Sequence, residues 1–210
     1  MAQNGNKNFQ RIGIMGGAFD PIHYGHLVTA EIARSKFKLD MVVFVPSGHP
    51  PHKRNLPGHA EQRLMMTMLA TVTNPHFQVS CAELDRQGLS YTYDTLVEFR
   101  ELYGDHCEFF FITGADAVLE MFTWRYAERL VEMCTFIAAT RPGYRLADVH
   151  RLPDDFNPKI ELMQVPALSI SSTDIRRRIN EGEPIKYLLP EAVETYIYKQ
   201  GLYQNAGECS

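Results

Sequence analysis

Short apolar runs alternate with amphipathic runs along the first 165 residues of the chain. Each apolar run predicts a buried strand, and these runs occupy residues 12–15, 41–45, 77–81, 108–113, 135–139 and 160–165. The amphipathic runs have helical spacing, and they occupy residues 27–37, 60–72, 93–102, 115–122 and 124–133. We expect Ser90 or Thr92 to cap the helix at 93–102. Apolar strands separated by helices are typical of βαβ units. The pattern therefore predicts an α/β fold with a doubly wound parallel sheet, covered by helices on both faces.

The last 45 residues depart from this alternation. Two helical patterns, at 172–181 and 190–199, follow one another with no strand between them. We therefore expect two units. The first is a sheet domain over residues 10–165, and the second is a small C-terminal helical subdomain over residues 166–203 that packs on the sheet.

The composition limits the classes of protein to which this chain can belong. The chain has 210 residues, of which 45% are hydrophobic and 22% are charged, which is typical of a globular protein that buries its own core. No two of its four cysteines have zinc-site or redox spacing, so we expect reduced thiols in a cytoplasmic protein. We find no signal core and no run of about 18 apolar residues, which argues against a membrane partner. The net charge of −4 argues against a nucleic-acid partner.

The stretch GGAFDPIHYGH, residues 16–26, lies between the first predicted strand and the first predicted helix. Ligands of parallel sheets bind at the carboxyl ends of the strands. Gly16 and Gly17 would let the backbone approach a ligand closely, and the helix start would offer free amides to an anion. His23 and His26 would donate hydrogen bonds to phosphate and, when protonated, add positive charge. Each feature alone is common in simple turns, at surfaces or in metal pairs, but the combination indicates a phosphate site.

A second candidate anion site precedes the helix at 172–181. Ser171 and Asp174 have the spacing of a capping box, and a capped helix start with free hydroxyls also binds anions. Three arginines follow at 176–178. Helical spacing spreads them over more than half of the helix circumference, so they cannot all reach one ligand. We expect Arg177 and Arg178 to be solvated surface residues.

Both candidate sites resemble signatures of one superfamily. The sequence HYGH at 23–26 resembles the (H/T)xGH signature of the nucleotidylyltransferases, and ISSTDIR at 170–176 resembles their ISSTxxR signature. Further segments resemble the bacterial nicotinate-nucleotide adenylyltransferases, namely PPHK at 50–53, SYTYDTL at 90–96, GAD at 114–116 and RPG at 141–143. The resemblance runs from about residue 10 to residue 203. It implies a Rossmann-like fold and transfer of the adenylyl group of ATP to nicotinate mononucleotide, which gives nicotinate adenine dinucleotide and pyrophosphate.

The resemblance also implies roles for individual residues. Its catalytic residues would be His23, His26 and Arg176. Its ATP-binding residues would be Gly16, Gly17, Ala18, Phe19, His23, His26, Gly114, Asp116, Ser171, Ser172, Thr173 and Arg176. Its residues for nicotinate mononucleotide would be Lys53, Thr92, Trp124 and Arg141. Mg²⁺ is expected on the ATP phosphates rather than at a metal site of the protein, because we see no dedicated carboxylate cage.

Several alternatives stay open at this point. Trp124 is also typical of a core residue, and Asp116 of a first-turn acid. Asp20 could either support its turn or help to organise the phosphate site. The chain could act on another acceptor, as the pantetheine-phosphate adenylyltransferases do, although those chains are usually shorter and lack the PPHK and SYTxDTL segments. A nucleotide-binding regulator without turnover is the alternative from a different class. The sequence leaves open the preference for nicotinate over nicotinamide mononucleotide, and whether the protein is a monomer or a homo-oligomer.

Overall fold

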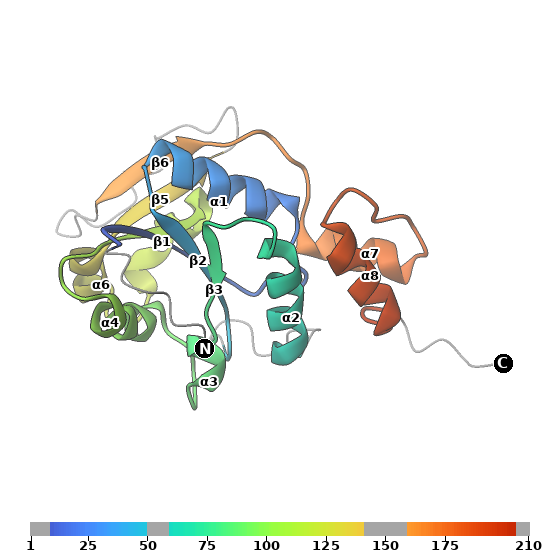
Figure 1. Ribbon diagram of the computed structural model, residues 1–210, viewed down its shortest axis with the longest axis horizontal. Coiled ribbons are helices and arrows are strands. Elements are labelled where there is room, and N and C mark those ends of the chain that lie inside the picture. Colours follow the sequence, from blue (N-terminus) through green and yellow to red (C-terminus); the bar gives the residue numbers. More distant parts are fainter. Residues whose placement is uncertain (1–8, 50–58, 141–158, 205–210) are drawn as a thin grey trace.

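The computed structural model describes residues 9–49, 59–140 and 159–204. Its centre is one six-stranded parallel sheet with the strand order β3-β2-β1-β4-β5-β6. The strands are β1 (Arg11–Gly17), β2 (Met41–Pro46), β3 (Phe77–Val79), β4 (Glu108–Gly114), β5 (Thr135–Thr140) and β6 (Ile160–Gln164). Figure 1 shows helices on both faces of this sheet. The predicted doubly wound α/β fold is therefore confirmed.

The helices agree with the sequence pattern in order, with local differences. They are α1 (Tyr24–Lys36), α2 (Ala60–Thr71), α3 (Ala82–Asp85), α4 (Thr92–Tyr103), α5 (Ala115–Leu119), the 3₁₀ helix η1 (Met121–Thr123), α6 (Ala127–Met133), α7 (Ser172–Asn180) and α8 (Glu191–Lys199). Helix α1 begins three residues earlier than predicted, because His23 caps it. The helix predicted at 115–122 is divided into α5 and η1, and the short α3 was not predicted.

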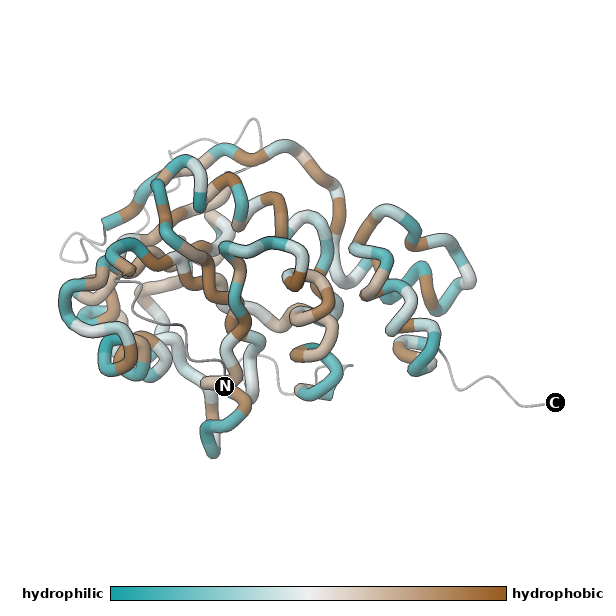
Figure 2. Tube along the Cα trace, viewed as in Figure 1, coloured by the Kyte–Doolittle hydropathy of each residue, from teal (hydrophilic) through white to brown (hydrophobic). Residues whose placement is uncertain are grey.

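Two apolar clusters cover the two faces of the sheet. Alternate residues of β4 point to opposite faces, so that Phe110 and Ile112 join the first cluster while Phe109 and Phe111 join the second. All six residues of β2 are buried. Figure 2 shows the resulting concentration of hydrophobic chain at the centre of the molecule. Burial on both faces explains why the strands read as unbroken apolar runs in the sequence.

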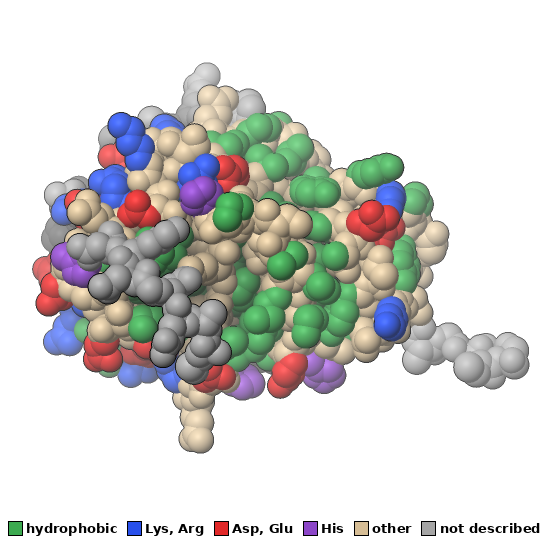
Figure 3. Space-filling model, in the orientation of Figure 1, with side chains coloured by type: hydrophobic (Ala, Val, Ile, Leu, Met, Phe, Trp, Pro, Cys, Tyr) green, Lys and Arg blue, Asp and Glu red, His purple; other side chains and the backbone are tan. Residues whose placement is uncertain are grey.

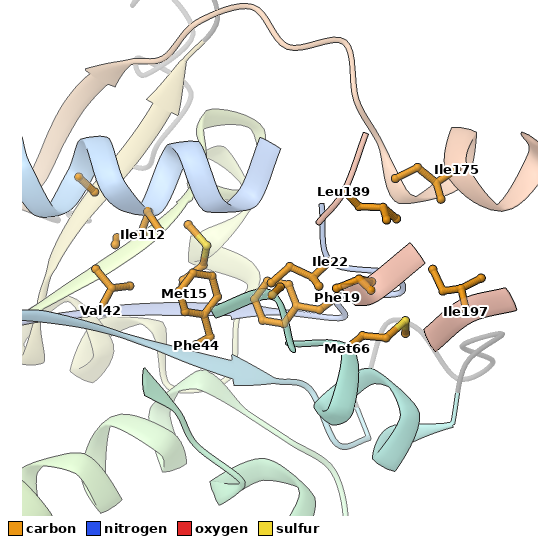
Figure 4. Packing of buried hydrophobic residues seen from close by; sticks show 14 of the residues in the cluster. Met15, Phe19, Ile22, Val42, Phe44, Met66, Ile112, Ile175, Leu189 and Ile197 are labelled. Carbon is orange, nitrogen blue, oxygen red and sulfur yellow. The ribbon is translucent and has the colours of Figure 1, made fainter. Parts of the chain in front are cut away.

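The C-terminal helices belong to the first cluster. Ile175 of α7 and Ile197 of α8 are fully buried, and they lie beyond Phe19, Ile22 and Met66 on the side away from the sheet (Figure 4). The same apolar cluster thus crosses residue 165, at which we divided the chain into two units. That boundary stays a prediction.

Two expectations from the composition concern the cysteines and membrane-spanning helices. Cys81, Cys107 and Cys134 are free thiols, and Cys209 lies outside the described residues. Within the described ranges, no helix combines the length and apolarity that a membrane span needs. Figure 3 shows that hydrophobic side chains also gather on one outer face, and Met65 and Met68 of α2 are among the exposed hydrophobic residues.

One buried arginine holds the carboxyl ends of β1 and β2 together. Arg63 of α2 is only 1% exposed. Its Nη1 donates to the carbonyl of Ala18 at 2.7 Å, and its Nη2 donates to the carbonyl of Ser47 at 2.6 Å. In the sequence, Arg63 lies in an amphipathic run, and we predicted no role for it.

Replacing this arginine should destabilise the protein strongly. Arg63→Met keeps much of the side-chain volume but leaves two carbonyls without their donor, so we expect the free energy of unfolding to fall by about 3 kcal/mol. Urea unfolding would measure this loss. Arg34→Met is the matched control, because Arg34 pairs with Glu31 at the surface and should matter much less. Equal stability of the two variants would contradict the role of Arg63.

Candidate active site

The chain turns sharply between β1 and α1, and the turn is anchored in the core. Phe19 has a φ of 49° and is 2% exposed. Its ring packs against Phe44 at a centroid distance of 5.8 Å and against the edge of His26 at 5.2 Å. Phe19 was predicted to bind ATP. Since its side chain is buried, only its backbone is placed to do so, and the ring instead fixes the turn.

The two glycines that end β1 pack closely against aromatic rings of the core. A Cβ at Gly16 would lie 3.3 Å from the ring of Phe111, and one at Gly17 would lie 3.0 Å from the ring of Phe19. The close approach of a ligand to these glycines stays a prediction, and packing gives a second reason for them. Their missing side chains leave room for buried aromatic rings, and any close approach of a ligand is an additional use of the same backbone.

His23 and His26 form a reciprocal cap at the start of α1. The Gly25 N–H donates to Nδ1 of His23 at 3.1 Å, and the His23 N–H donates to Nδ1 of His26 at 3.3 Å. The two rings stack with centroids 3.8 Å apart. Because both Nδ1 atoms accept hydrogen bonds, the hydrogen-bond pattern assigns the remaining ring proton to Nε2. The turn thus presents a pair of Nε2–H donors.

Burial keeps His23 neutral. This side chain is 6% exposed, and desolvation lowers its pKa from 6.5 to about 4. This shift favours the uncharged imidazole of His23 in the free protein at pH 7, so the added positive charge considered for a protonated His23 is not expected there. His23 acts there as a neutral donor.

The lowered pKa of His23 makes the stability of the protein depend on pH. Between pH 6.5 and 4 the unfolded chain binds a proton at His23 that the folded protein does not bind. The free energy of unfolding should thus fall as the pH drops through this window, by up to about 3 kcal/mol from this residue. His23→Asn keeps a side-chain acceptor for the cap and should lose this dependence. Urea unfolding of both proteins at pH 7 and 4 checks this, and identical pH dependence would contradict it.

A cavity of about 330 Å³ opens beside the histidine pair. Its polar wall contains His23, His26, Gly16 and Gly114, all of which were predicted to bind ATP. Its apolar wall is formed by Met15, Val28, Ile112, Ala139, Val165, Pro166, Leu168 and Ile170. The cavity lies at the carboxyl ends of β1 and β4, where the strand order changes direction. Open α/β sheets bind nucleotides at such switch points.

The segment ISSTDIR at 170–176 is hydrogen-bonded to the turn of the segment GGAFDPIHYGH at 16–26. Ser172 donates from Oγ to the carbonyl of Pro21 at 2.8 Å, and Arg176 donates from Nη1 to the carbonyl of Asp20 at 2.6 Å. Arg176 also donates to Thr173 Oγ1 at 3.4 Å. The two predicted phosphate sites, separated by about 150 positions in the chain, therefore meet at one place.

Ser171 caps the start of α7 as predicted, but the Asp174 carboxylate does not complete the reciprocal capping box. Ser171 Oγ accepts from the Asp174 N–H at 3.1 Å. The Asp174 carboxylate pairs instead with Arg177 at 2.8 Å and Arg178 at 2.7 Å, and these arginines lower its pKa. Arg177 and Arg178 are therefore occupied in surface ion pairs, whereas Arg176 lies against the turn.

Asp20 supports the turn, which was one of the two roles considered for it. Its carboxylate accepts a hydrogen bond of 2.5 Å from the hydroxyl of Tyr203, near the C-terminal end of the described chain. Burial, together with this hydrogen bond, raises the pKa of Tyr203, so the hydroxyl keeps its proton and remains a donor. We predicted no role for Tyr203 from the sequence.

The residues predicted for the nicotinate ring lie away from the cavity. Thr92 is the first residue of α4, and Trp124 follows η1 and packs its ring edge-to-face on Phe111, with centroids 6.0 Å apart. Phe111 belongs to the second apolar cluster, whereas Ile112 lines the cavity on the other face. The predicted nucleotide and nicotinate sites are therefore on opposite faces of β4, near its carboxyl end.

The predicted cap of α4 is wrong. We expected Ser90 or Thr92 to cap this helix, but Tyr91 occupies the N-cap position and makes no side-chain cap. Ser90 Oγ instead accepts from the His49 N–H at 3.1 Å and donates to the carbonyl of Glu83 at 3.4 Å. It thereby connects the segment after β2 to the start of α4.

Of three other predicted site residues, Asp116, Lys53 and Arg141, the structure describes only Asp116. Asp116 is exposed in the first turn of α5, which suits both roles considered for it. Lys53 and Arg141 lie outside the described residues. Across residues 9–49, 59–140 and 159–204, no three His, Cys, Asp or Glu side chains are grouped to hold a metal ion.

Comparisons with known proteins identify the family of this chain. A family model described as cytidylyltransferase-like matches residues 14–178. The chain is 58% identical over 199 residues to the probable nicotinate-nucleotide adenylyltransferase of Moorella thermoacetica, covering 92% of each protein. It is 54% identical over 206 residues to the protein of the same name from Thermoanaerobacter sp., covering 94% of this chain and 96% of that protein.

A solved structure with a similar fold is the Plasmodium falciparum nicotinic acid mononucleotide adenylyltransferase complexed with NaAD. Its TM-score is 0.74 at 24% identity, over 92% of this chain and 97% of that one. The two sequence relatives are much closer in identity, and their matches extend over nearly the whole chain. The chain belongs to the cytidylyltransferase-like family and, within it, to the nicotinate-nucleotide adenylyltransferases.

Proposed function

We propose that this protein transfers the adenylyl group of ATP to nicotinate mononucleotide, which gives nicotinate adenine dinucleotide and pyrophosphate. The observation that carries the proposal is the pair of Nε2–H donors at His23 and His26, beside a cavity at the switch point of the sheet. Membership of the family supports the choice of substrates.

The 5′-phosphate of the mononucleotide is the nucleophile, and it attacks the α-phosphorus of ATP. This phosphate is ionised at pH 7, so the reaction needs no general base, which fits a histidine pair whose Nδ1 atoms already accept hydrogen bonds. The chain's task is to hold two phosphate groups in line and to stabilise the charge that develops on the leaving pyrophosphate.

The residues divide this task between them. His23 and His26 donate to the phosphate oxygens of ATP, together with the amides of the Gly17 turn and of the α7 start. Arg176 turns from the Asp20 carbonyl toward the triphosphate and stabilises the leaving group. Asp116, two residues beyond the cavity wall at Gly114, accepts a hydrogen bond from the ribose.

The mononucleotide binds on the other side of β4. Trp124 stacks on the pyridine ring, and the free amides at the start of α4, near Thr92, receive its carboxylate. Lys53 and Arg141 hold its phosphate. Mg²⁺ bound to the phosphates of ATP would neutralise part of their charge.

Product analysis tests the proposed reaction. ATP and Mg²⁺ are incubated with nicotinate mononucleotide, nicotinamide mononucleotide or phosphopantetheine, and pyrophosphate release and the adenylylated product are measured. We expect the highest kcat/KM with the nicotinate form. Activity with phosphopantetheine alone would overturn the acceptor assignment, and ATP binding without turnover of any acceptor would favour a regulator.

Gly25 offers a geometric test of the histidine pair. A Cβ at this position would lie 2.9 Å from Cε1 and Nδ1 of His23, so Gly25→Ala must displace the imidazole. We expect kcat/KM for ATP to fall about 10²-fold, because small misplacements of a positioning group have effects of this size. Circular dichroism would show that the fold remains. Full activity of a folded variant would contradict the placement of His23.

A further inference from the structure

An arginine lies between aromatic rings at the proposed pyridine end of the site. Arg125 directly follows Trp124, and its Cζ is 4.6 Å from the ring centroid of Tyr91 and 4.8 Å from that of Tyr126. Its Nη2 also donates to the hydroxyl of Tyr126 at 3.0 Å. Since Tyr91 immediately precedes Thr92, Arg125 connects the two segments proposed to hold the nicotinate ring.

The platform that holds this guanidinium is itself supported. The ring of Tyr126 packs against Tyr93 of α4 at a centroid distance of 5.0 Å. Cations over aromatic faces are attracted by the ring quadrupole, and a planar guanidinium stacks there while its edge keeps free N–H groups. The rings therefore orient Arg125, and part of its set of donors, at Nη2, is engaged by the hydroxyl of Tyr126.

Among the ion pairs of the described ranges Arg125 has no acidic partner, a property it shares with Arg129, but only Arg125 has its guanidinium over both Tyr91 and Tyr126. Arg11, Arg34, Arg86, Arg177 and Arg178 each pair with a carboxylate. Arg125 instead contacts the two tyrosines, whose hydrogen bonds raise its pKa. An oriented cation without a carboxylate is suited to receive one from a ligand.

We infer that Arg125 selects the acid form of the pyridine mononucleotide over the amide form, which rests on the proposed function. The two forms differ at one substituent of the ring, a carboxylate in one and a neutral carboxamide in the other. The guanidinium donates to both oxygens of the carboxylate and gains a charge-assisted contact, whereas the carboxamide offers one neutral oxygen. Arg125 is exposed, so solvent weakens the contact, and a discrimination of about tenfold is expected from it.

The test compares kcat/KM for nicotinate and nicotinamide mononucleotide in Arg125→Gln. The value for the acid should fall about tenfold through a higher KM, and the value for the amide should stay the same. Arg129→Gln is the matched control: it removes the same charge from a residue whose Cζ is 5.9 Å from the Tyr126 ring, and the acid-to-amide ratio should not change. Arg125→Lys should recover part of the ratio.

The outcomes separate this inference from the proposed function. If Arg125→Gln lowered kcat/KM equally for both acceptors, Arg125 would have a purely structural role and the inference would be overturned. It would also be overturned if neither value of kcat/KM changed. Failure of the unmodified protein to use nicotinate mononucleotide would overturn the proposed function itself. Raising the salt concentration gives a second readout, because it should reduce the ratio in the unmodified protein but not in Arg125→Gln.

Discussion

A His26→Ala variant should turn over about 10²- to 10³-fold more slowly than the unmodified protein, with a smaller change in the binding of ATP. The Nε2–H of His26 is a fixed donor, since the His23 N–H holds its Nδ1 and the ring stacks on His23. Removing one preorganised donor from a site of developing charge typically has an effect of this size. Steady-state rates of pyrophosphate release with saturating ATP would measure it.

Two further variants separate chemistry from folding. His26→Gln retains an acceptor for the His23 N–H, as in an ordinary capping box, so it should be about as stable as the unmodified protein while remaining slow. His76→Ala removes an exposed imidazole on the far side of β2 and should keep full activity. A folded His26→Ala protein with an unchanged rate would remove His26 from the mechanism.

The second large effect is expected at Arg176. Arg176→Ala should lower kcat/KM for ATP about 10²-fold, because it removes the charged fork that stabilises the leaving pyrophosphate. The neighbouring Arg177 provides the control, since its guanidinium is occupied by Asp174 and Glu183 at the surface. Arg177→Ala should therefore have nearly normal activity. Similar losses in the two variants would indicate a general effect of charge on α7 and contradict the role of Arg176.

Arg176→Lys refines this prediction. Lysine keeps the positive charge but cannot donate in the bidentate manner of a guanidinium, so activity should lie between those of the unmodified protein and Arg176→Ala. Full activity of Arg176→Lys would show that charge alone is sufficient, and the forked contact proposed between Arg176 and the triphosphate would need revision.

Local pattern was enough to predict most of the fold. The strands are buried on both faces, so each appears in the sequence as an apolar run, and the helices between them have amphipathic spacing. The same logic predicts the phosphate site, because His23, Gly25 and His26 lie close together in the chain. Helix α1 nevertheless starts earlier than its apolar pattern, since a histidine cap has no strong signature in sequence.

The supports of the site depend on contacts that are distant in sequence, and these were not predictable. Arg63 reaches the carbonyls of Ala18 and Ser47, and Tyr203 reaches Asp20. A charged residue on the apolar side of a helix is a signal that would have found Arg63. Tyr203 offers no comparable signal, because its partner lies 183 positions away.

Only the structure could show that β4 lies between the two predicted substrate sites. Phe111 and Ile112 are adjacent, yet one contacts Trp124 and the other lines the cavity. The alternation of side chains along a strand dictates this, but only the sheet order shows which helices lie on each face. The prediction of the α4 cap was wrong for a similar reason, because Ser90 forms hydrogen bonds with His49 and Glu83, which are distant in sequence.

The measurement that tests the central claim most directly is side-chain ¹⁵N NMR of the histidines, in the free protein and with ATP and Mg²⁺ at pH 7. We predict that His23 is neutral with its proton on Nε2, that Nδ1 of His26 accepts a hydrogen bond, and that ATP changes the Nε2 signals of both residues while leaving His76 unaffected. A positively charged His23 in the free protein, or Nε2 signals that do not respond to ATP, would contradict the proposed phosphate site.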